Sequence, residues 1–242
     1  MPDPAPDSLD LLVFGPHPDD LEIGMAGTIL RHTTAGKRVG LCDLTRGEMG
    51  SNGTPDERLA EAEAARVVLG AALRMNLELP DGWLRPDDQS QVRTVASCIR
   101  RLRPKTIAAP YWRDRHPDHV TASKLVTHAV FKSGLRRYRD APGDPWRVDW
   151  VVYYFINNDD AAPSFVIDVT AHYARKKASM ACHRSQFAPS GSSATNTRLT
   201  TPLFMQLVES RDARFGAQVG VPYAEGFVVK QPLLRDSLLF SS

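Results

Sequence analysis

Short apolar segments alternate with longer segments of helical character along most of the chain. The apolar segments predict strands at residues 9–15, 39–44, 75–79, 106–109, 150–156, 165–169 and 223–229. Capping residues and stop signals predict helices at residues 20–36, 54–70, 89–102, 118–133 and 170–183, and another after Pro202. Strands and helices therefore follow one another through the sequence.

This alternation is typical of an α/β fold in which right-handed crossovers cover both faces of a parallel sheet. We predict a single domain over residues 1–242, a Rossmann-like three-layer α/β/α domain with a mainly parallel sheet. In such sheets ligands bind beyond the carboxyl ends of the strands, where the strand order reverses. The residues that follow strands one, two and four are therefore the first candidates for a functional site.

The charge of the chain gives no reason to expect a polyanionic partner. The sequence has 30 Lys and Arg against 28 Asp and Glu, a formal net charge of +2. Neither nucleic acid nor a membrane is therefore expected as a partner. Two basic runs, residues 100–103 and 175–177, lie near the ends of predicted helices, where we expect them to be solvated.

The cysteines and the first residues of the sequence indicate the cellular compartment in which the protein is expected. Cys42, Cys98 and Cys182 are odd in number and far apart, which argues against a disulfide framework. The sequence opens with an acidic, proline-rich segment, and its first apolar run is too short for a signal peptide or a membrane span. These features predict a cytoplasmic protein.

Histidines and carboxylates are concentrated after three predicted strands. His17-Pro18-Asp19-Asp20 follows strand one, Thr45-Arg46-Gly47-Glu48 follows strand two, and the run from Arg113 to His119 follows strand four. These clusters fall where the fold predicts an active site. That agreement is stronger evidence than either His-Pro-Asp motif alone.

The types of these residues favour a metal-dependent hydrolysis. His17, Asp20 and His119 offer two imidazoles and one carboxylate with a fourth position open, which suits Zn²⁺ but also Fe²⁺, Mn²⁺ or Co²⁺. Asp19 is placed to act as the general base. His116 could stabilise the oxyanion, with Asp118 holding it in its protonated form.

These motifs also have simpler explanations. Asp19 or Asp20 could merely cap a helix, although two such motifs on adjacent loops favour the metal site. His183 is expected to interact with the dipole at the end of the late helix. The sequence has no GxSxG elbow, no P-loop and no GxGxxG after a strand, so serine hydrolase and nucleotide chemistry are not predicted.

At these residues the chain resembles the LmbE-like (PIG-L) N-deacetylases. The signature pair of that family, His-Pro-Asp-Asp and His-Pro-Asp-His, is intact at residues 17–20 and 116–119. The chain also resembles the bacillithiol-biosynthesis deacetylases, which hydrolyse N-acetylglucosaminyl-malate to glucosaminyl-malate and acetate. That closer resemblance rests on residues 24–25, 43–48, 58, 79–82, 109–112, 115–119, 163–165 and 185–187.

The resemblance implies roles for the matching residues of this chain. It makes His17, Asp20 and His119 the zinc ligands and Asp19 the general base, and it makes His116, supported by Asp118, the oxyanion stabiliser or acid. It also implies that Arg46 and Glu48 line the sugar pocket, and that the protein is a homo-oligomer, with a hexamer as one form.

One position departs from the family pattern. The family often has arginine in the run after Gly50-Ser51, where this chain has Asn52. If that arginine holds an anionic aglycone, Arg113, Arg115 or Arg184 would have to replace it here. The polar stretch 188–196 is expected to be an ordinary flexible loop, with a lid over the sugar as the alternative.

The sequence thus predicts a zinc-dependent deacetylase of an N-acetylglucosamine derivative, with N-acetylglucosaminyl-malate as the expected substrate. Another N-acetylated sugar, such as a chitooligosaccharide, and the amide of a thiol conjugate remain alternative substrates. From a different class, a metal-binding protein that binds a sugar without turnover also remains open. The presence of Asp19 beside the predicted ligands argues against it, because a binder needs no general base.

Overall fold

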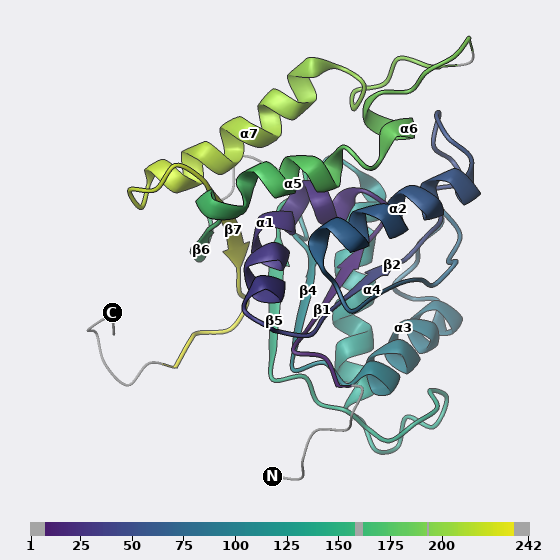
Figure 1. Cartoon of the computed structure of the whole chain (residues 1–242). Helices are drawn as coiled ribbons and strands as arrows, with labels where there is room; N and C mark the ends of the chain where they lie inside the picture. The colour runs from purple at the N-terminus through teal and green to yellow at the C-terminus, as the bar shows by residue number, and fades with distance from the viewer. Residues whose placement is uncertain (1–7, 158–161, 193, 235–242) are drawn as a thin grey trace.

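The computed structural model describes residues 8–157, 162–192 and 194–234. These form three layers, with a seven-stranded sheet between two layers of helices (Figure 1). The strands are β1 (Leu11–Gly15), β2 (Val39–Asp43), β3 (Leu73–Asn76), β4 (Thr106–Pro110), β5 (Trp150–Tyr154), β6 (Phe165–Asp168) and β7 (Ala224–Val228). The helices are α1 (Asp20–Thr34), α2 (Pro55–Leu69), α3 (Gln89–Leu102), α4 (Pro117–Ser133), α5 (Tyr173–Met180), α6 (Arg184–Phe187) and α7 (Pro202–Ala217), with a short 3-10 helix at Thr170–His172.

The order of the strands in the sheet is β3-β2-β1-β4-β5-β7-β6. The first five of these are parallel to one another, and only β7 runs antiparallel to its neighbours β5 and β6. The chain moves from β1 through β2 to β3 on one side, then returns to place β4 on the other side of β1. The strand order therefore reverses between β1 and β4, where a ligand site is expected.

Side chains of the buried strands point alternately to two apolar cores. In β1, Leu12 and Phe14 pack with α3 and α4, whereas Leu11 and Val13 pack with α1 on the opposite face. Figure 1 shows α3 and α4 on one side of the strands and α1, α2 and α5 on the other. The predicted α/β/α fold with a mainly parallel sheet is confirmed.

Local sequence signals account for several of the helix ends. At the start of α2, Thr54 Oγ1 accepts a hydrogen bond from the Glu57 backbone N–H at 3.2 Å, and the Glu57 carboxylate accepts one from the Thr54 N–H at 2.8 Å. This is the predicted capping box. Gly70 follows the helix in a left-handed conformation, as expected of a C-terminal stop.

The two basic runs are not simply solvated, as the sequence suggested. Lys176 is fully buried, with its ammonium 2.6 Å from Asp212 and 2.7 Å from Glu225. Arg100 is also buried, and its guanidinium donates hydrogen bonds to the carbonyls of Ser133, Ala141 and Leu135. Partners from distant segments neutralise or hydrogen-bond these cations, which the sequence around each basic run does not reveal.

The late helix also differs from its prediction. The predicted helix at 170–183 is divided into the 3-10 turn and α5, which ends at Met180, and α6 begins only after the predicted range. His183 lies after α5, fully buried, with its Nε2 3.2 Å from Glu22 Oε2, so its partner is a carboxylate of α1 and not the helix dipole. Over the described part of the chain, no helix is long and apolar enough to cross a membrane.

Candidate active site

The turns that follow β1 and β4 bring the two His-Pro-Asp segments together at the carboxyl edge of the sheet. They line a cavity of about 440 Å³ to which the segments after β2, β3 and β5 also contribute. The cavity lies at the point where the strand order reverses. Its polar lining residues include His17, Asp19, Asp20, Arg58, Asp81, His116, Asp118, His119, Asn157 and Gln186.

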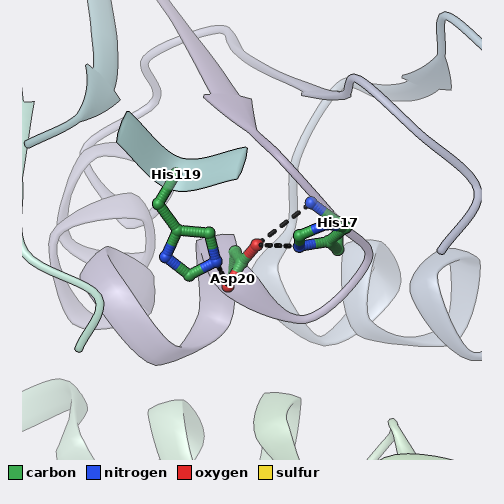
Figure 2. A group of neighbouring side chains, drawn as sticks. All are labelled: His17, Asp20 and His119. Atoms are coloured by element: carbon green, nitrogen blue, oxygen red, sulfur yellow. Dashed lines mark hydrogen bonds and ion pairs between the residues drawn. The ribbon is translucent and has the colours of Figure 1, made fainter. Parts of the chain in front are cut away.

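Asp20 stands between two imidazoles (Figure 2). One carboxylate oxygen lies 3.0 Å from His17 Nδ1, and the other lies 3.3 Å from His119 Nε2. All three side chains are buried, and each offers a ligand atom within 4.8 Å of the others. The structure therefore brings together the three residues that the sequence predicted as metal ligands.

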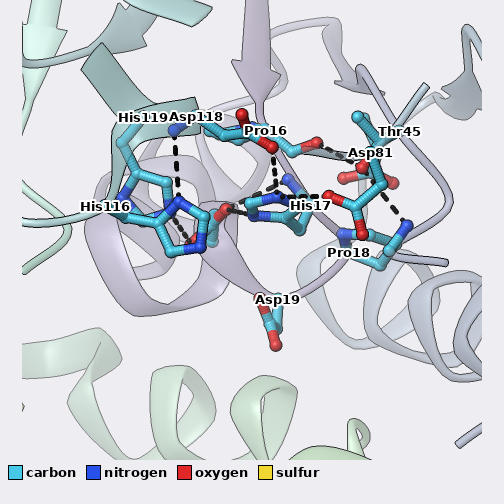
Figure 3. Close-up of polar contacts among 12 residues, drawn as sticks. Pro16, His17, Pro18, Asp19, Thr45, Asp81, His116, Asp118 and His119 are labelled. Atoms are coloured by element: carbon cyan, nitrogen blue, oxygen red, sulfur yellow. Dashed lines mark hydrogen bonds and ion pairs between the residues drawn. The ribbon is translucent and has the colours of Figure 1, made fainter. Parts of the chain in front are cut away.

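The remaining nitrogen of each imidazole faces carboxylates. His17 Nε2 lies 3.1 Å from Asp81 Oδ1 and 3.4 Å from Asp118 Oδ2 (Figure 3). His119 Nδ1 lies 3.2 Å from Asp114 Oδ2. A carboxylate on one ring nitrogen fixes the tautomer and leaves the other nitrogen with a free lone pair for a metal. Both rings thus present the nitrogen that faces Asp20.

These carboxylates perturb the protonation of the site. Burial lowers the pKa of His119, but Asp20 and Asp114 outweigh it and raise that pKa to about 9. Burial opposes ionisation of Asp20 as well, yet the two histidines hold its pKa well below its usual value. A metal that binds His119 would therefore have to displace a proton from it.

Asp19 occupies a strained position beside these residues. Its φ is 118°, which is rare outside glycine and costs roughly 1–3 kcal/mol. Although Asp19 is the N-cap residue of α1, its side chain makes no capping hydrogen bond, so capping does not explain the residue. Burial raises the pKa of its carboxyl group to about 6. Figure 3 shows this carboxylate apart from the His17 cluster.

Arg58 of α2 connects two of the loops that surround the cavity. Its guanidinium donates to the Pro18 carbonyl at 2.8 Å and to the Gly47 carbonyl at 3.0 Å. It also lies 3.5 Å from the Asp19 carboxylate. Gly47 has a φ of +71°, and a Cβ there would meet the guanidinium at 1.8 Å. The glycine of the segment after β2 is therefore required for the position of Arg58.

His116 is an exposed residue at the N-terminus of α4, with its ring stacked on that of His119. Its Nδ1 accepts the Asp118 backbone N–H at 3.2 Å, so a neutral ring carries its proton on Nε2. Although the residue is exposed, partial desolvation of its ring and the charges of His119 and His17 lower its pKa. The Asp118 carboxylate faces His17 and the Gly82 N–H, and its predicted support of a protonated His116 stays a prediction.

Comparison with known proteins gives the family. The family model described as PIG-L, GlcNAc-PI de-N-acetylase, matches residues 12–130. The diacetylchitobiose deacetylase of Thermococcus kodakarensis is 30% identical over 201 residues, which cover 76% of this chain and 73% of that protein. The chain belongs to the PIG-L family.

Two further matches extend along most of the chain. A Bacillus anthracis protein named "Probable N-acetyl-alpha-D-glucosaminyl L-malate deacetylase 2" is 29% identical over 193 residues, 74% of this chain and 81% of that protein. A crystal structure of a conserved protein from Thermus thermophilus superposes with a TM-score of 0.86 at 40% identity, over 96% of this chain and all of that one. The fold is thus that of a solved structure.

The residues predicted to bind substrate lie outside the lining of the cavity. The Arg46 side chain pairs with Asp56, and the Glu48 carboxylate accepts the Arg46 backbone N–H at 3.1 Å. Arg184 lines a neighbouring cavity of about 490 Å³, and Arg113 is exposed. Their role in binding the substrate stays a prediction.

Asn52, the position that the sequence suggested as a departure from the family, joins two loops. Its side-chain amide donates to the Thr195 carbonyl and accepts the Thr195 backbone N–H, both at 2.8 Å. Its own carbonyl accepts a hydrogen bond at 2.7 Å from Gln186, which lines the cavity. Asn52 therefore holds part of the polar loop at 188–196 in place, and Ser193 of that loop lies outside the described residues.

Several residues of the site had no role assigned from the sequence. Asp81 follows β3 and Asn157 follows β5, and both line the cavity. Asp114, after β4, accepts hydrogen bonds from the backbone N–H groups of His116 and Asn157. The same rule that pointed to strands one, two and four would have found Asp81 and Asn157 if extended to strands three and five.

The position of Arg58 gives a test of Gly47. We expect Gly47→Ala to lower the free energy of unfolding by about 3 kcal/mol, because strain at positive φ adds to the loss of buried hydrogen bonds from Arg58. Gly36→Ala is the matched control, since Gly36 has a φ of +74° and open space around its Cβ position. It should cost about 1 kcal/mol. Urea unfolding would measure both, and equal losses would contradict the role of Gly47.

Proposed function

We propose that this protein is a metal-dependent hydrolase that removes the N-acetyl group from an N-acetylglucosamine derivative. The observation that carries the proposal is the buried group of His17, Asp20 and His119, with the strained Asp19 beside it on the wall of one cavity. Relatives in the PIG-L family named for sugar N-deacetylation support the choice of reaction.

The donor set fits zinc. Two imidazole nitrogens and one carboxylate are the ligands of many catalytic zinc sites, and both histidines are oriented by carboxylates as such ligands usually are. Bound there, the metal would supply a Lewis acid and would lower the pKa of a coordinated water. A second group, His17, His116 and Asp118, is also close enough to hold an ion, but His116 is exposed and its ring lacks a carboxylate at Nδ1.

The chain supplies the proton transfers. Asp19 is buried beside the donor set, and the raised pKa of its carboxyl group suits a general base that accepts a proton from the attacking water. The neutral His116 presents Nε2–H as a donor for the oxyanion of the tetrahedral intermediate. Asp19, which now carries that proton, then delivers it to the departing amine as the C–N bond breaks, and this completes the hydrolysis of the acetamide.

A binding protein without catalysis has no use for this arrangement. The strain at Asp19 is a cost to folding that persists only where the surrounding structure enforces it, and such strain is concentrated at functional sites. Arg58 and Gly47 enforce it here through the Pro18 carbonyl. The backbone geometry at Asp19 thus favours an enzyme over the metal-binding or sugar-binding alternative.

On the aglycone, we propose that neutral groups are accepted at least as well as malate. Arg58 is the one arginine among the described residues that line the cavity, and its guanidinium already contacts two carbonyls and Asp19. Asn52 is hydrogen-bonded to Thr195 and carries no charge. The lining therefore offers little to bind the carboxylates of malate, although N-acetylglucosaminyl-malate was the substrate expected from the sequence.

Replacement of Asp19 should separate activity from stability. At pH 8, Asp19→Asn should lower kcat by about 100-fold or more, because the general base is lost. It should also stabilise the metal-free protein by roughly 1 kcal/mol, because a carboxyl group whose pKa is raised on folding destabilises the fold once it is ionised above pH 6. Thermal unfolding and zinc content would be measured together with acetate release.

Replacement of the neighbouring Asp20 should act on the metal. Asp20→Ala should lose bound zinc as well as activity, because Asp20 contacts both histidines of the donor set. Asp19→Asn should keep its zinc. If both variants retained wild-type activity, the assigned roles would be wrong.

The substrate can be tested by acetate release. Zinc-loaded protein should release acetate from N-acetylglucosaminides, and treatment with a chelator should abolish the reaction. We expect kcat/KM for diacetylchitobiose to equal or exceed that for N-acetylglucosaminyl-malate. A tenfold preference for the malate glycoside that Arg113→Ala or Arg184→Ala removes would refute the proposal on the aglycone and support those two arginines as its partners.

A further inference from the structure

Helix α1, which begins at the proposed ligand Asp20, is broken after one turn. Met25 has a φ of −152° and a ψ of 25°, outside the helical range, so the residues before and after it form two separate helical pieces. A break of this kind leaves carbonyls of the first piece and N–H groups of the second without partners in the helix. These groups are buried and need other partners.

The broken ends are satisfied by two charged side chains from the far end of the sequence. Arg211 of α7 donates to the Ile23 carbonyl at 2.8 Å, on the first piece. Glu225 of β7 accepts the N–H groups of Gly27 at 2.9 Å and Thr28 at 2.7 Å, on the second piece. A carboxylate at the N-terminus of a helical piece is favourable, as is a cation at the C-terminus of the other.

Two more buried charges join these side chains to each other. Lys176 lies between Glu225 and Asp212, at 2.7 and 2.6 Å, and Arg211 Nε lies 3.0 Å from Asp212 Oδ1. All four side chains are buried, and their formal charges sum to zero. Each charge therefore has an opposite partner, which buried ions require.

Arg211 also holds a second wall of the cavity. Its Nη1 donates to the carbonyls of Phe155 at 3.1 Å and Ile156 at 2.7 Å. The next residue, Asn157, lines the cavity, and its side chain lies 3.4 Å from His119 Nδ1. One guanidinium thus connects the turn that carries Asp20 with the segment that contacts His119.

We infer that Arg211 and Glu225 are positioning residues that set the distance between Asp20 and His119 and thereby the affinity of the site for its metal. The inference rests on the proposed function, because it takes these two residues as ligands. Neither positioning residue lines the cavity. They act through the backbone of α1 and of the segment after β5, where a displacement of a ligand by even part of an ångström weakens coordination.

If Arg211 only stabilised the fold, its replacement would lower stability without changing the affinity for zinc. Any buried arginine that loses its carbonyl partners destabilises the fold. Arg100 is such a residue, because it is as buried as Arg211 and donates to four backbone carbonyls. It belongs to α3, its partners lie at the end of α4 and in the loop at 135–143, and it does not line the cavity. Arg100→Lys is therefore a matched control for Arg211→Lys.

The experiment measures the zinc dissociation constant of the full-length folded protein by competition with a chromophoric chelator, together with thermal unfolding of the metal-free form. Arg211→Lys and Glu225→Gln should each raise the dissociation constant by about 10- to 100-fold. The visible spectrum of the cobalt-substituted protein should also change, since it reports ligand geometry. Arg100→Lys should lower thermal stability by a similar amount while its zinc affinity stays within about twofold of wild type.

The outcomes separate the two proposals. If Arg211→Lys and Glu225→Gln lose stability but bind zinc as tightly as Arg100→Lys, the positioning role is wrong while the metal site stands. If His119→Ala binds zinc as tightly as wild type, the proposed metal site itself is wrong. Should Arg211→Lys not fold, Glu225→Gln tests the same inference, because it keeps the shape of the side chain and removes one backbone contact and the charge.

Discussion

The two oxygens of Asp20 reach imidazoles that come from different strand ends, one from the turn after β1 and the other from the first turn of α4. Because β1 and β4 are adjacent and parallel, their carboxyl ends lie side by side, and a short carboxylate can span them. The rest of the site is arranged around this contact. The carboxylates of Asp81 and Asp118 face His17 Nε2, and that of Asp114 faces His119 Nδ1. These contacts fix the orientation of both rings.

So many charged groups in one buried space would be unfavourable without compensation. Asp19, Asp20, Asp81, Asp114 and Asp118 lie around three histidines and Arg58, and opposite charges are close enough to pair directly. Asp19 is the least compensated of the five carboxylates, with a raised pKa and a strained backbone. Stability is thus lost at the residue that we propose to be the general base.

Two late elements, β7 and α7, support the site through buried side chains that contact the backbone behind it. Strand β7 reverses the direction of the sheet and brings Glu225 beneath the break in α1. Helix α7 brings Arg211 to the same break and to the end of β5. The PIG-L family model matches residues 12–130, so both residues come from outside the matched part of the chain. They link the helix that begins at Asp20 to elements more than 180 residues away.

The sequence predicts the fold class and the metal-ligand candidates, because both depend on local sequence patterns. Alternating apolar segments and capping residues such as Thr54 and Glu57 specify strands and helices directly. The rule that ligands bind at the carboxyl ends of parallel strands then predicts that His17, Asp20 and His119 lie together. Their placement depends on strand order, which the alternation of strands and helices restricts to few possibilities.

Side-chain partners across the fold could not be read in the same way. Nothing in the sequence indicates that Lys176 is enclosed by Asp212 and Glu225, or that Asp118 turns to His17 and not to His116. Residues far apart along the chain form these contacts, and a cation looks the same in sequence whether water or a carboxylate surrounds it. The sequence by itself determined the elements and the chemical groups, whereas the tertiary structure decided which groups are buried, which are paired and which way each ring presents its nitrogen.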